Sequence, residues 1–398
     1  MAPISQPPSA RPSFAAHTLV LPILERLVAF DTTSRNSNLA LIAWVEDELA
    51  RHGVASRRVY DPAGDKANLW ATIGPADQPG YILSGHTDVV PVDGQDWTSP
   101  PFTLTRDGAT VVGRGAADMK GFLACCLAAV PAMTMARLKR PIHLAFSYDE
   151  EVGCTGVRGL IEELQHESVR PLACFVGEPT EMQVVVAHKS KRSYRIVVTG
   201  HACHSSLAPE GVNAVEYLAR LVVFIRDLGR RMAQGDSDPM YDIPVSTTHT
   251  GVIEGGTAVN IVPDRASAVF EFRLLPHVDS DAVFGAIEAY ARDVLEPEMK
   301  AIAPRAGIRF EYVSGIPGLD TAGDAPVTQL AMRLAGRNDL AKVAYGTEAG
   351  LFAGIDIPTV VVGPGNIEQA HKPDEFIVVS ELDRCMAFLA RLIAHCEA

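Results

Sequence analysis

Positive charge is scarce in this sequence. The 35 Lys and Arg residues stand against 48 Asp and Glu residues, which gives a formal net charge of −13. No stripe of basic residues interrupts this acidic excess. Nucleic acid and anionic membranes repel such a chain, so we expect neither as a partner. Buried carboxylates around a divalent cation would account for part of the excess, and an acidic surface would do the same.

Paired cysteines and long apolar runs are missing as well. The seven cysteines are an odd number, and no two of them have the Cys-x-x-Cys spacing. This argues against a disulfide framework and for a reducing compartment, so we expect a cytoplasmic protein. We find no apolar run long enough to span a membrane. Segment 1–13 is rich in Pro and Ser without an apolar stretch, which indicates a frayed tail rather than a signal peptide.

The length of the chain predicts two domains. Its 398 residues, 47% hydrophobic and 21% charged, have a globular composition and exceed what one core usually holds. Helical patterns alternate with buried strands up to residue 186, and this character returns at 314–398. The intervening segment 187–313 has the order β-α-β-β-α-β, typical of a four-stranded antiparallel sheet with two helices on one face. We therefore predict an α/β mixed-sheet domain (1–186 plus 314–398) with an inserted ferredoxin-like domain (187–313).

A histidine and an aspartate follow a strongly apolar strand. The strand is predicted at 81–83, Gly85 ends the run, and His86 and Asp88 come where it stops. Because ligands bind beyond the carboxyl ends of strands in α/β sheets, both side chains are placed for a binding cleft. Residues two apart on a strand share one face, so one can bind a metal ion while the other orients it. Taken alone, the pair is equally compatible with a surface turn.

Further acidic residues stand at the ends of other predicted strands. Asp118 lies in a Gly-rich turn before an apolar helix, where a carboxylate is also favourable without a metal. Three consecutive acidic residues, 149–151, follow a buried strand at 142–147, and Glu178 follows another at 172–176. Carboxylates crowded at the mouth of a sheet require a compensating cation. The residues of the predicted cluster are His86, Asp118, Glu150, Glu151, Glu178 and His371.

This donor set predicts a hydrolytic metal site. Two histidines and several carboxylates, without a cysteine ligand, suit Zn²⁺ or a similar borderline cation. Two metals about 3.5–4 Å apart need a bridging carboxylate and can share a hydroxide that acts as the nucleophile. A nearby carboxylate that does not bind metal would take the proton from that water and pass it to the leaving amine.

Four ordered motifs resemble the M20 family of metallopeptidases and deacylases: SGHTDVVP at 84–91, GRGAADMKG at 113–121, DEEVG at 149–153 and GEPT at 177–180. Together with His371, the resemblance runs from about residue 20 to the C-terminus and includes the inserted domain. It implies an enzyme that hydrolyses a small N-acylated amino acid. Two more stretches, QDWTSPPF at 95–102 and GTEA at 346–349, are similar to members of the family that remove an acetyl group.

The resemblance implies two Zn²⁺ ions per subunit, which Co²⁺ can replace. Asp118 would bridge the two ions. His86 and Glu178 would complete one metal site, and Glu151 and His371 the other. A cis peptide bond after Asp118 is implied as well. Because every implied ligand is present in this sequence, a non-catalytic binding homologue is disfavoured.

The resemblance also implies roles for residues that do not bind metal. Glu150 would be the general base, and Asp88 would orient the ring of His86. The inserted domain would act as a lid and would form the contact surface of a homodimer. His204 in this domain would reach an active site and stabilise the oxyanion, an interaction worth roughly 3–4 kcal/mol.

Three residues are predicted to hold the substrate. Asn260 and Arg273 match positions of the inserted domain that bind a substrate carboxylate or carbonyl, and a guanidinium suits a carboxylate. Arg273 could equally be a solvated strand residue. Glu348 is the candidate for pairing with a cationic substrate side chain, although it could instead cap a loop. The closest alternative activity is that of another acyl-amino-acid hydrolase of the same family.

Overall fold

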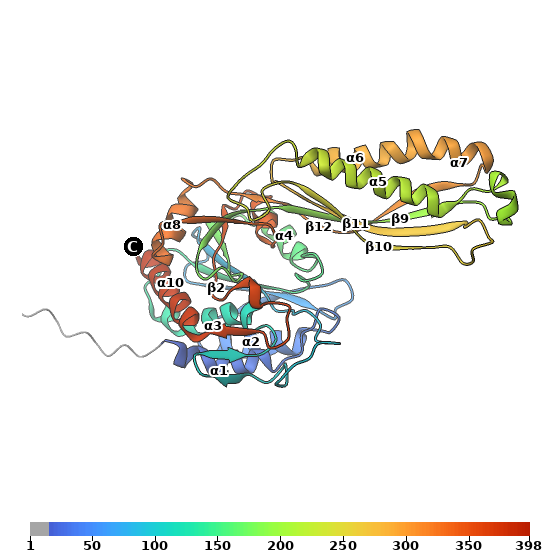
Figure 1. Cartoon of the computed structure of the whole chain (residues 1–398). Helices are drawn as coiled ribbons and strands as arrows, with labels where there is room; N and C mark the ends of the chain where they lie inside the picture. Colours follow the sequence, from blue (N-terminus) through green and yellow to red (C-terminus); the bar gives the residue numbers. More distant parts are fainter. Residues whose placement is uncertain (1–15) are drawn as a thin grey trace, which may run out of the picture.

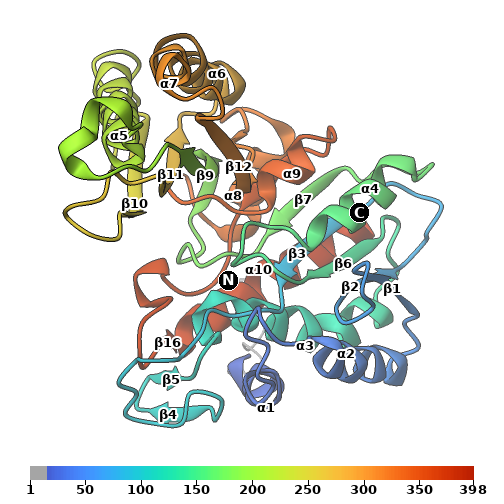
Figure 2. The same cartoon turned by 90° about the vertical axis from the view of Figure 1, so that its right-hand side faces the viewer.

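The computed structural model describes residues 16–398, so the predicted frayed tail at 1–13 lies outside the described residues. An α/β part contains both ends of the described chain, and an elongated second part projects from it (Figure 1). Viewed along a perpendicular direction, the second part stands to one side of the central strands of the first (Figure 2).

A nine-stranded mixed sheet forms the centre of the α/β part. The neighbouring strands β6, β3, β7 and β15 run parallel to one another, and the outer strands pair antiparallel, apart from β14, which is parallel to β8. This confirms the predicted mixed-sheet α/β class. In spatial order the strands are β1 (Ser56–Tyr60), β2 (Ala67–Ile73), β6 (Ile142–Ser147), β3 (Tyr81–His86), β7 (Ala173–Val176), β15 (Thr359–Val361), β8 (Val184–His188) and β13 (Leu319–Asp320), with β14 (Leu340–Val343) also beside β8.

Helices cover both faces of this sheet because its central strands are apolar on both sides. Every residue of β3 and β6 is buried, as expected for parallel strands between two helical layers. Alternate residues enter different cores: Leu144 packs with one helical layer and Ala145 with the other. The first layer is α1 (His17–Val28), α2 (Leu39–Arg51), α3 (Gly121–Met135), α8 (Pro326–Ala335) and α10 (Val379–Glu397), and the second is α4 (Val157–His166) and α9 (Ala349–Ala353).

One helical stretch of the described chain, Ala116–Met135, is long and apolar enough to cross a membrane by length and composition alone. The prediction that no apolar run is long enough to span a membrane is therefore wrong by length and composition. Of the most apolar window of this stretch, 83% is buried inside the protein. It consists of a π-helical turn (Ala116–Lys120) and α3, which packs between α1 and α10. Its apolar character is therefore that of a core helix.

The second part is a four-stranded antiparallel sheet in the order β10-β11-β9-β12. Its helices lie along one face of the sheet (Figure 1). The second helical segment begins at Ser280 and continues to Ile302 past Pro297, because Pro297 falls in the first turn of α7 (Glu296–Ile302), where a missing N–H is tolerated. The elements in chain order are β9 (Ser190–Thr199), α5 (Ala214–Met232), β10 (Thr247–Gly255), β11 (Arg265–Leu274), α6 (Ser280–Tyr290), a π-helical turn (Ala291–Leu295), α7 (Glu296–Ile302) and β12 (Gly307–Ile316).

A small three-stranded sheet was not predicted. It joins a hairpin near residue 108 to the strand that precedes α10, and its strands have only three residues each, too few for a clear alternating pattern. They are β4 (Thr105–Asp107), β5 (Thr110–Val112) and β16 (Phe376–Val378). Short 3-10 turns at Ser205–Glu210 and Ile367–Gln369 complete the structure.

Candidate active site

The predicted cluster gathers where three parallel strands end. β3 lies between β6 and β7, so the residues that follow these strands meet at one edge of the sheet. His86 is the last residue of β3, Glu150 and Glu151 follow β6, and Glu178 follows β7. This is the edge at which α/β sheets bind ligands.

Asp118 stands between two histidine rings and offers one oxygen to each. His86 Nε2 is 2.9 Å from Asp118 Oδ1 and 3.7 Å from Glu178 Oε1. His371 Nε2 is 3.2 Å from Asp118 Oδ2 and 3.0 Å from Glu151 Oε2. The structure thus brings together all five predicted ligands as two triplets that share Asp118. The Asp118–Met119 peptide bond is cis, as the resemblance implied.

The electrostatics of this cluster fit divalent cations. Burial, together with the neighbouring carboxylates, raises the pKa of Glu150 to about 8 and that of Glu151 to about 7. Against the opposing effect of burial, hydrogen bonds from His371 and His86 hold the pKa of Asp118 well below its usual range. Among the described residues, Glu151 Oε1 and Glu178 Oε1 are buried acceptors without a hydrogen-bond partner. Such oxygens and two imidazole nitrogens form a donor set that suits Zn²⁺.

Asp88 supports the cluster through more contacts than predicted. His86 Nδ1 is 2.8 Å from the main-chain carbonyl oxygen of Asp88 and 3.5 Å from its carboxylate. A proton on Nδ1 leaves the lone pair of Nε2 free for a metal ion. The Asp88 carboxylate accepts hydrogen bonds from the Ser34 hydroxyl at 2.7 Å and from the backbone N–H groups of Glu150 and Glu151. It therefore also holds the turn that carries the two glutamates.

A cysteine that the sequence analysis did not connect with the site touches Glu150. The buried thiol of Cys154 donates a hydrogen bond to Glu150 Oε1 at 3.2 Å. Its place four residues after Glu150, in the turn that follows β6, is the signal that could have identified it. The thiol limits the orientations open to the carboxylate.

A cavity of about 310 Å³ opens beside the cluster. Its wall includes cluster residues such as Asp118 and Glu150 and, from β11 of the second part, Arg273. The guanidinium donates through Nε to Glu271 Oε1 at 2.9 Å, and Lys191 lies 3.4 Å from the other oxygen of Glu271. Lys191 and Tyr345 also line this cavity, and neither was predicted. Tyr345 directly precedes the GTEA stretch, which was the available signal. The cavity can therefore present cationic groups to a substrate carboxylate.

Besides His86 of the cluster and Asp88, which supports it, three predicted residues lie outside the lining of this cavity. His204 and Asn260 occupy neighbouring exposed loops of the second part, where the Ser205 N–H donates to the Asn260 carbonyl at 3.0 Å. Glu348 is fully buried, and its oxygens accept hydrogen bonds from the hydroxyls of Ser84 (2.6 Å) and Ser147 (2.7 Å). This environment favours the structural alternative for Glu348 over contact with substrate.

Comparisons of the sequence and of the structure with known proteins agree on one family. The profile of Peptidase family M20/M25/M40 matches residues 82–395. Acetylornithine deacetylases of Pasteurella multocida (strain Pm70) and Myxococcus xanthus are 32% and 33% identical to this chain, over 96% and 94% of its length and 98% and 96% of theirs. A dinuclear metal-binding M20 peptidase of Bacillus subtilis has the same fold, with a TM-score of 0.66 at 17% identity over 96% of this chain and 98% of that one. From the cluster geometry, the profile and these identities, we conclude that the chain belongs to peptidase family M20/M25/M40.

Proposed function

We propose that this protein hydrolyses the N-acetyl amide of N2-acetyl-L-ornithine to L-ornithine and acetate, a step of arginine biosynthesis. The observation that carries the chemistry is the pair of ligand triplets sharing Asp118, with Glu150 buried beside them. The choice of substrate is supported by relatives named acetylornithine deacetylase that match nearly the whole chain. Succinyl-diaminopimelate desuccinylase and aminoacylase activities are the alternatives within the family.

Two Zn²⁺ ions, replaceable by Co²⁺, would be held by the five predicted ligands. When bound, they would polarise the acyl carbonyl and acidify the attacking water. Glu150 would accept the proton of that water and deliver it to the amide nitrogen, so that the amine leaves neutral. Asp88 would keep His86 and the 150–151 turn in position while this proton moves.

Residues of the second part would bind and orient the substrate. Arg273 lines the cavity, and its Nη groups would hold the α-carboxylate of the amino acid in a two-point contact. His204 and Asn260 lie on exposed loops, so their predicted contacts with the oxyanion and the substrate require closure of this part or a loop from a second subunit. We propose that the second part acts as the lid.

A comparison of three substrates tests this function. Metal-reconstituted protein is assayed with N-acetyl-L-ornithine, N-succinyl-diaminopimelate and N-acetyl-methionine, each with and without a chelator. We expect the highest kcat/KM for acetylornithine, with activity abolished by the chelator. Chelator-sensitive preference for another substrate would contradict the substrate assignment and retain the two-metal chemistry. Activity that is insensitive to exhaustive chelation would contradict the chemistry itself.

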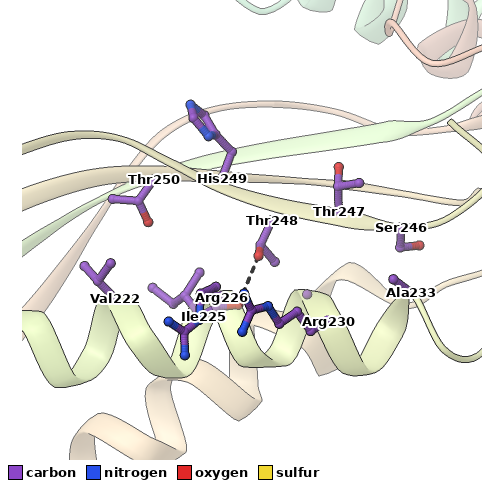
Figure 3. A pocket seen from close by; sticks show the side chains of 11 residues that line it. Val222, Ile225, Arg226, Arg230, Ala233, Ser246, Thr247, Thr248, His249 and Thr250 are labelled. Atoms are coloured by element: carbon purple, nitrogen blue, oxygen red, sulfur yellow. Dashed lines mark hydrogen bonds between the residues drawn. The ribbon is translucent and has the colours of Figure 1, made fainter.

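We also propose a homodimer formed through the edge strand β10. Within residues 16–398 this strand pairs only with β11, and its side chains Val252 and Ile253 are about half exposed, which makes it a surface for strand pairing. Beside it, a cavity of about 430 Å³ between α5 and β10 leaves room for side chains of a second copy; Thr248 bonds to the Ile225 carbonyl there (Figure 3). Light scattering should show a dimer that Ile253→Lys dissociates, and a monomeric wild-type protein would contradict the proposal.

The seven free thiols support the expectation of a reducing, cytoplasmic location. Six of them are buried, and Cys203 is half-buried. We propose this location together with the biosynthetic role. Fractionation of the source cells, with activity in the cytosolic fraction, is the expected result.

A further inference from the structure

The carboxylate of Glu375 organises the turn that carries Asp118. Glu375 is 1% exposed, and its Oε1 accepts hydrogen bonds from the backbone N–H groups of Ala117 (2.9 Å) and Asp118 (3.0 Å). Its Oε2 accepts from the N–H of Gly115 at 3.0 Å and from Nη1 of Arg114 at 2.8 Å. One side chain therefore satisfies three main-chain donors of a buried turn.

These hydrogen bonds fix the main-chain position of Asp118, from which its side chain extends. Gly115 has a φ of +80°, a conformation that glycine adopts without cost, and the chain reverses there before it reaches Asp118. A buried carboxylate that accepts hydrogen bonds from several N–H groups of such a turn fixes the orientation of those groups. Without it, three N–H groups would lie buried and unpaired, which favours rearrangement of the turn.

The same network extends to the loop that carries His371. Glu375 lies four residues after His371, and Arg114 Nη1 also donates to the carbonyl of Lys372 at 3.3 Å. Arg114 Nη2 donates to Oε1 of Gln95, and Gln95 Nε2 donates to the main-chain carbonyl of His371 at 2.9 Å. The main chain at His371 and Lys372 is thus tied to the turn of Asp118.

The loop 95–97 completes the support. The Trp97 indole N–H donates to Gln95 Oε1 at 3.0 Å, and the Arg114 guanidinium lies 4.9 Å from the centre of the Trp97 ring. The stretch QDWTSPPF was identified in the sequence only by its resemblance to members of the family. These contacts give it a structural role. It keeps Gln95 and Arg114 in the orientation that the two ligand-bearing segments require.

We propose that Glu375, supported by Arg114 and Gln95, is a positioning residue that presets Asp118 and His371 for divalent cations. It acts through the main chain of the turn and needs no contact with the ions. The inference rests on the proposed two-metal function. It adds that the affinity of the site for cations depends on Glu375, a carboxylate that does not itself contact them.

Cation binding by Glu375→Gln tests the proposal. The amide keeps the volume of the side chain but turns one acceptor into a donor, which then faces either the Ala117 and Asp118 N–H groups or Gly115 and Arg114. We expect Zn²⁺ affinity, measured by competition with a chromophoric chelator, to fall by about 10- to 100-fold. This is the usual effect of replacing a residue that supports metal ligands without binding the metal itself. The visible absorption spectrum of the Co²⁺ form should change as well.

The matched control is Glu381→Gln. Glu381 is also a buried carboxylate of the C-terminal segment and pairs with Arg384 on α10, and among the described residues it makes no hydrogen bond or ion pair with the Asp118 turn or with the five predicted ligands. It should leave cation affinity and the Co²⁺ spectrum unchanged. Wild-type affinity and spectrum in folded Glu375→Gln protein would overturn the inference and leave the proposed function standing. A wild-type protein that binds no divalent cation would overturn both.

Gln95→Ala decides the matter if Glu375→Gln does not fold. Gln95 lies on a partly exposed loop, so its truncation leaves the core intact. The variant loses the bond to the His371 carbonyl and the acceptor shared by Arg114 Nη2 and the Trp97 indole N–H. We expect a smaller loss of affinity than in Glu375→Gln, about 3- to 10-fold. Unchanged affinity in Gln95→Ala, with a normal circular dichroism spectrum, would then overturn the inference.

Discussion

Replacing Glu348 separates a structural role from a role in substrate binding. The side chain is fully buried and accepts hydrogen bonds from Ser84, two residues before His86 on β3, and from Ser147, the last residue of β6. It therefore joins the ends of two strands that lead into the cluster of predicted metal ligands. We expect Glu348→Ala to destabilise the fold and to affect all substrates alike.

The magnitude follows from what the two serines lose. Ser84 can turn to the carbonyl of Ala145, 3.5 Å away, whereas Ser147 loses the acceptor of its hydroxyl. A buried donor without a partner costs about 1–3 kcal/mol. With the cavity left by the side chain, Glu348→Ala should lower the free energy of unfolding by about 3–5 kcal/mol. Glu348→Gln should cost only about 1 kcal/mol, because the amide oxygen still accepts and a serine oxygen can accept from the amide nitrogen.

Denaturant unfolding of the chelated protein measures these differences, with Ser147→Ala as the matched control for the lost hydrogen bond. KM for N-acetyl-L-ornithine and for N-acetyl-methionine should change by the same factor in both Glu348 variants. The reasoning is refuted if Glu348→Gln keeps wild-type stability and raises KM at least tenfold for acetylornithine alone. In that case Glu348 recognises the substrate ammonium group.

Four further outcomes are expected. Glu150→Gln should retain bound metal and lose about 10²- to 10⁴-fold in kcat, the usual contribution of a general base; near-wild-type turnover would exclude that role. Cys154→Ala should lower kcat several-fold and Cys154→Ser should restore it, since only the hydroxyl can replace the lost donor; equal loss in both would point to packing instead. His204→Ala should lower kcat more than metal content, as measured by elemental analysis. In the metal-free protein, burial raises the pKa of Glu150 from 4.5 to about 8 and that of Glu151 from 4.5 to about 7. The native state therefore holds these two protons more tightly than the unfolded chain does. Each of them should cost up to roughly 1.4 kcal/mol of stability per pH unit as the pH rises through the interval between its unfolded and folded pKa, which ends near pH 7 for Glu151 and near pH 8 for Glu150; a flat profile in urea unfolding across these intervals would contradict this.

Local patterns in the sequence predicted several elements well. A continuous apolar run predicted a buried strand at 142–147, and β6 has these bounds. Glu150 and Glu178 were expected just beyond strand ends, where chain connectivity alone places them. The β-α-β-β-α-β order of the second part was equally visible, because each element has its own hydrophobic period.

Such local patterns could not predict contacts between distant segments of the chain. Glu375 Oε1 meets the N–H of Asp118 across 257 residues, and Ser84 meets Glu348 across 264. The periodicity of a strand or helix shows which face is buried, but it does not show which distant segment covers that face. Lys191 and Glu375 were missed for this reason, whereas Cys154 lies only four residues from Glu150 and was missed although its position was a local signal.

The sequence by itself determined the residues of the cluster, the strands that end beside them and the family of the chain. Only the tertiary structure decided that β3 lies between β6 and β7, that Asp118 faces both histidines, and that Glu348 is buried away from the cavity. Strand order and loop docking depend on the packing of the whole core. The free energy of that packing is shared among segments hundreds of residues apart, so no single stretch of the chain contains it.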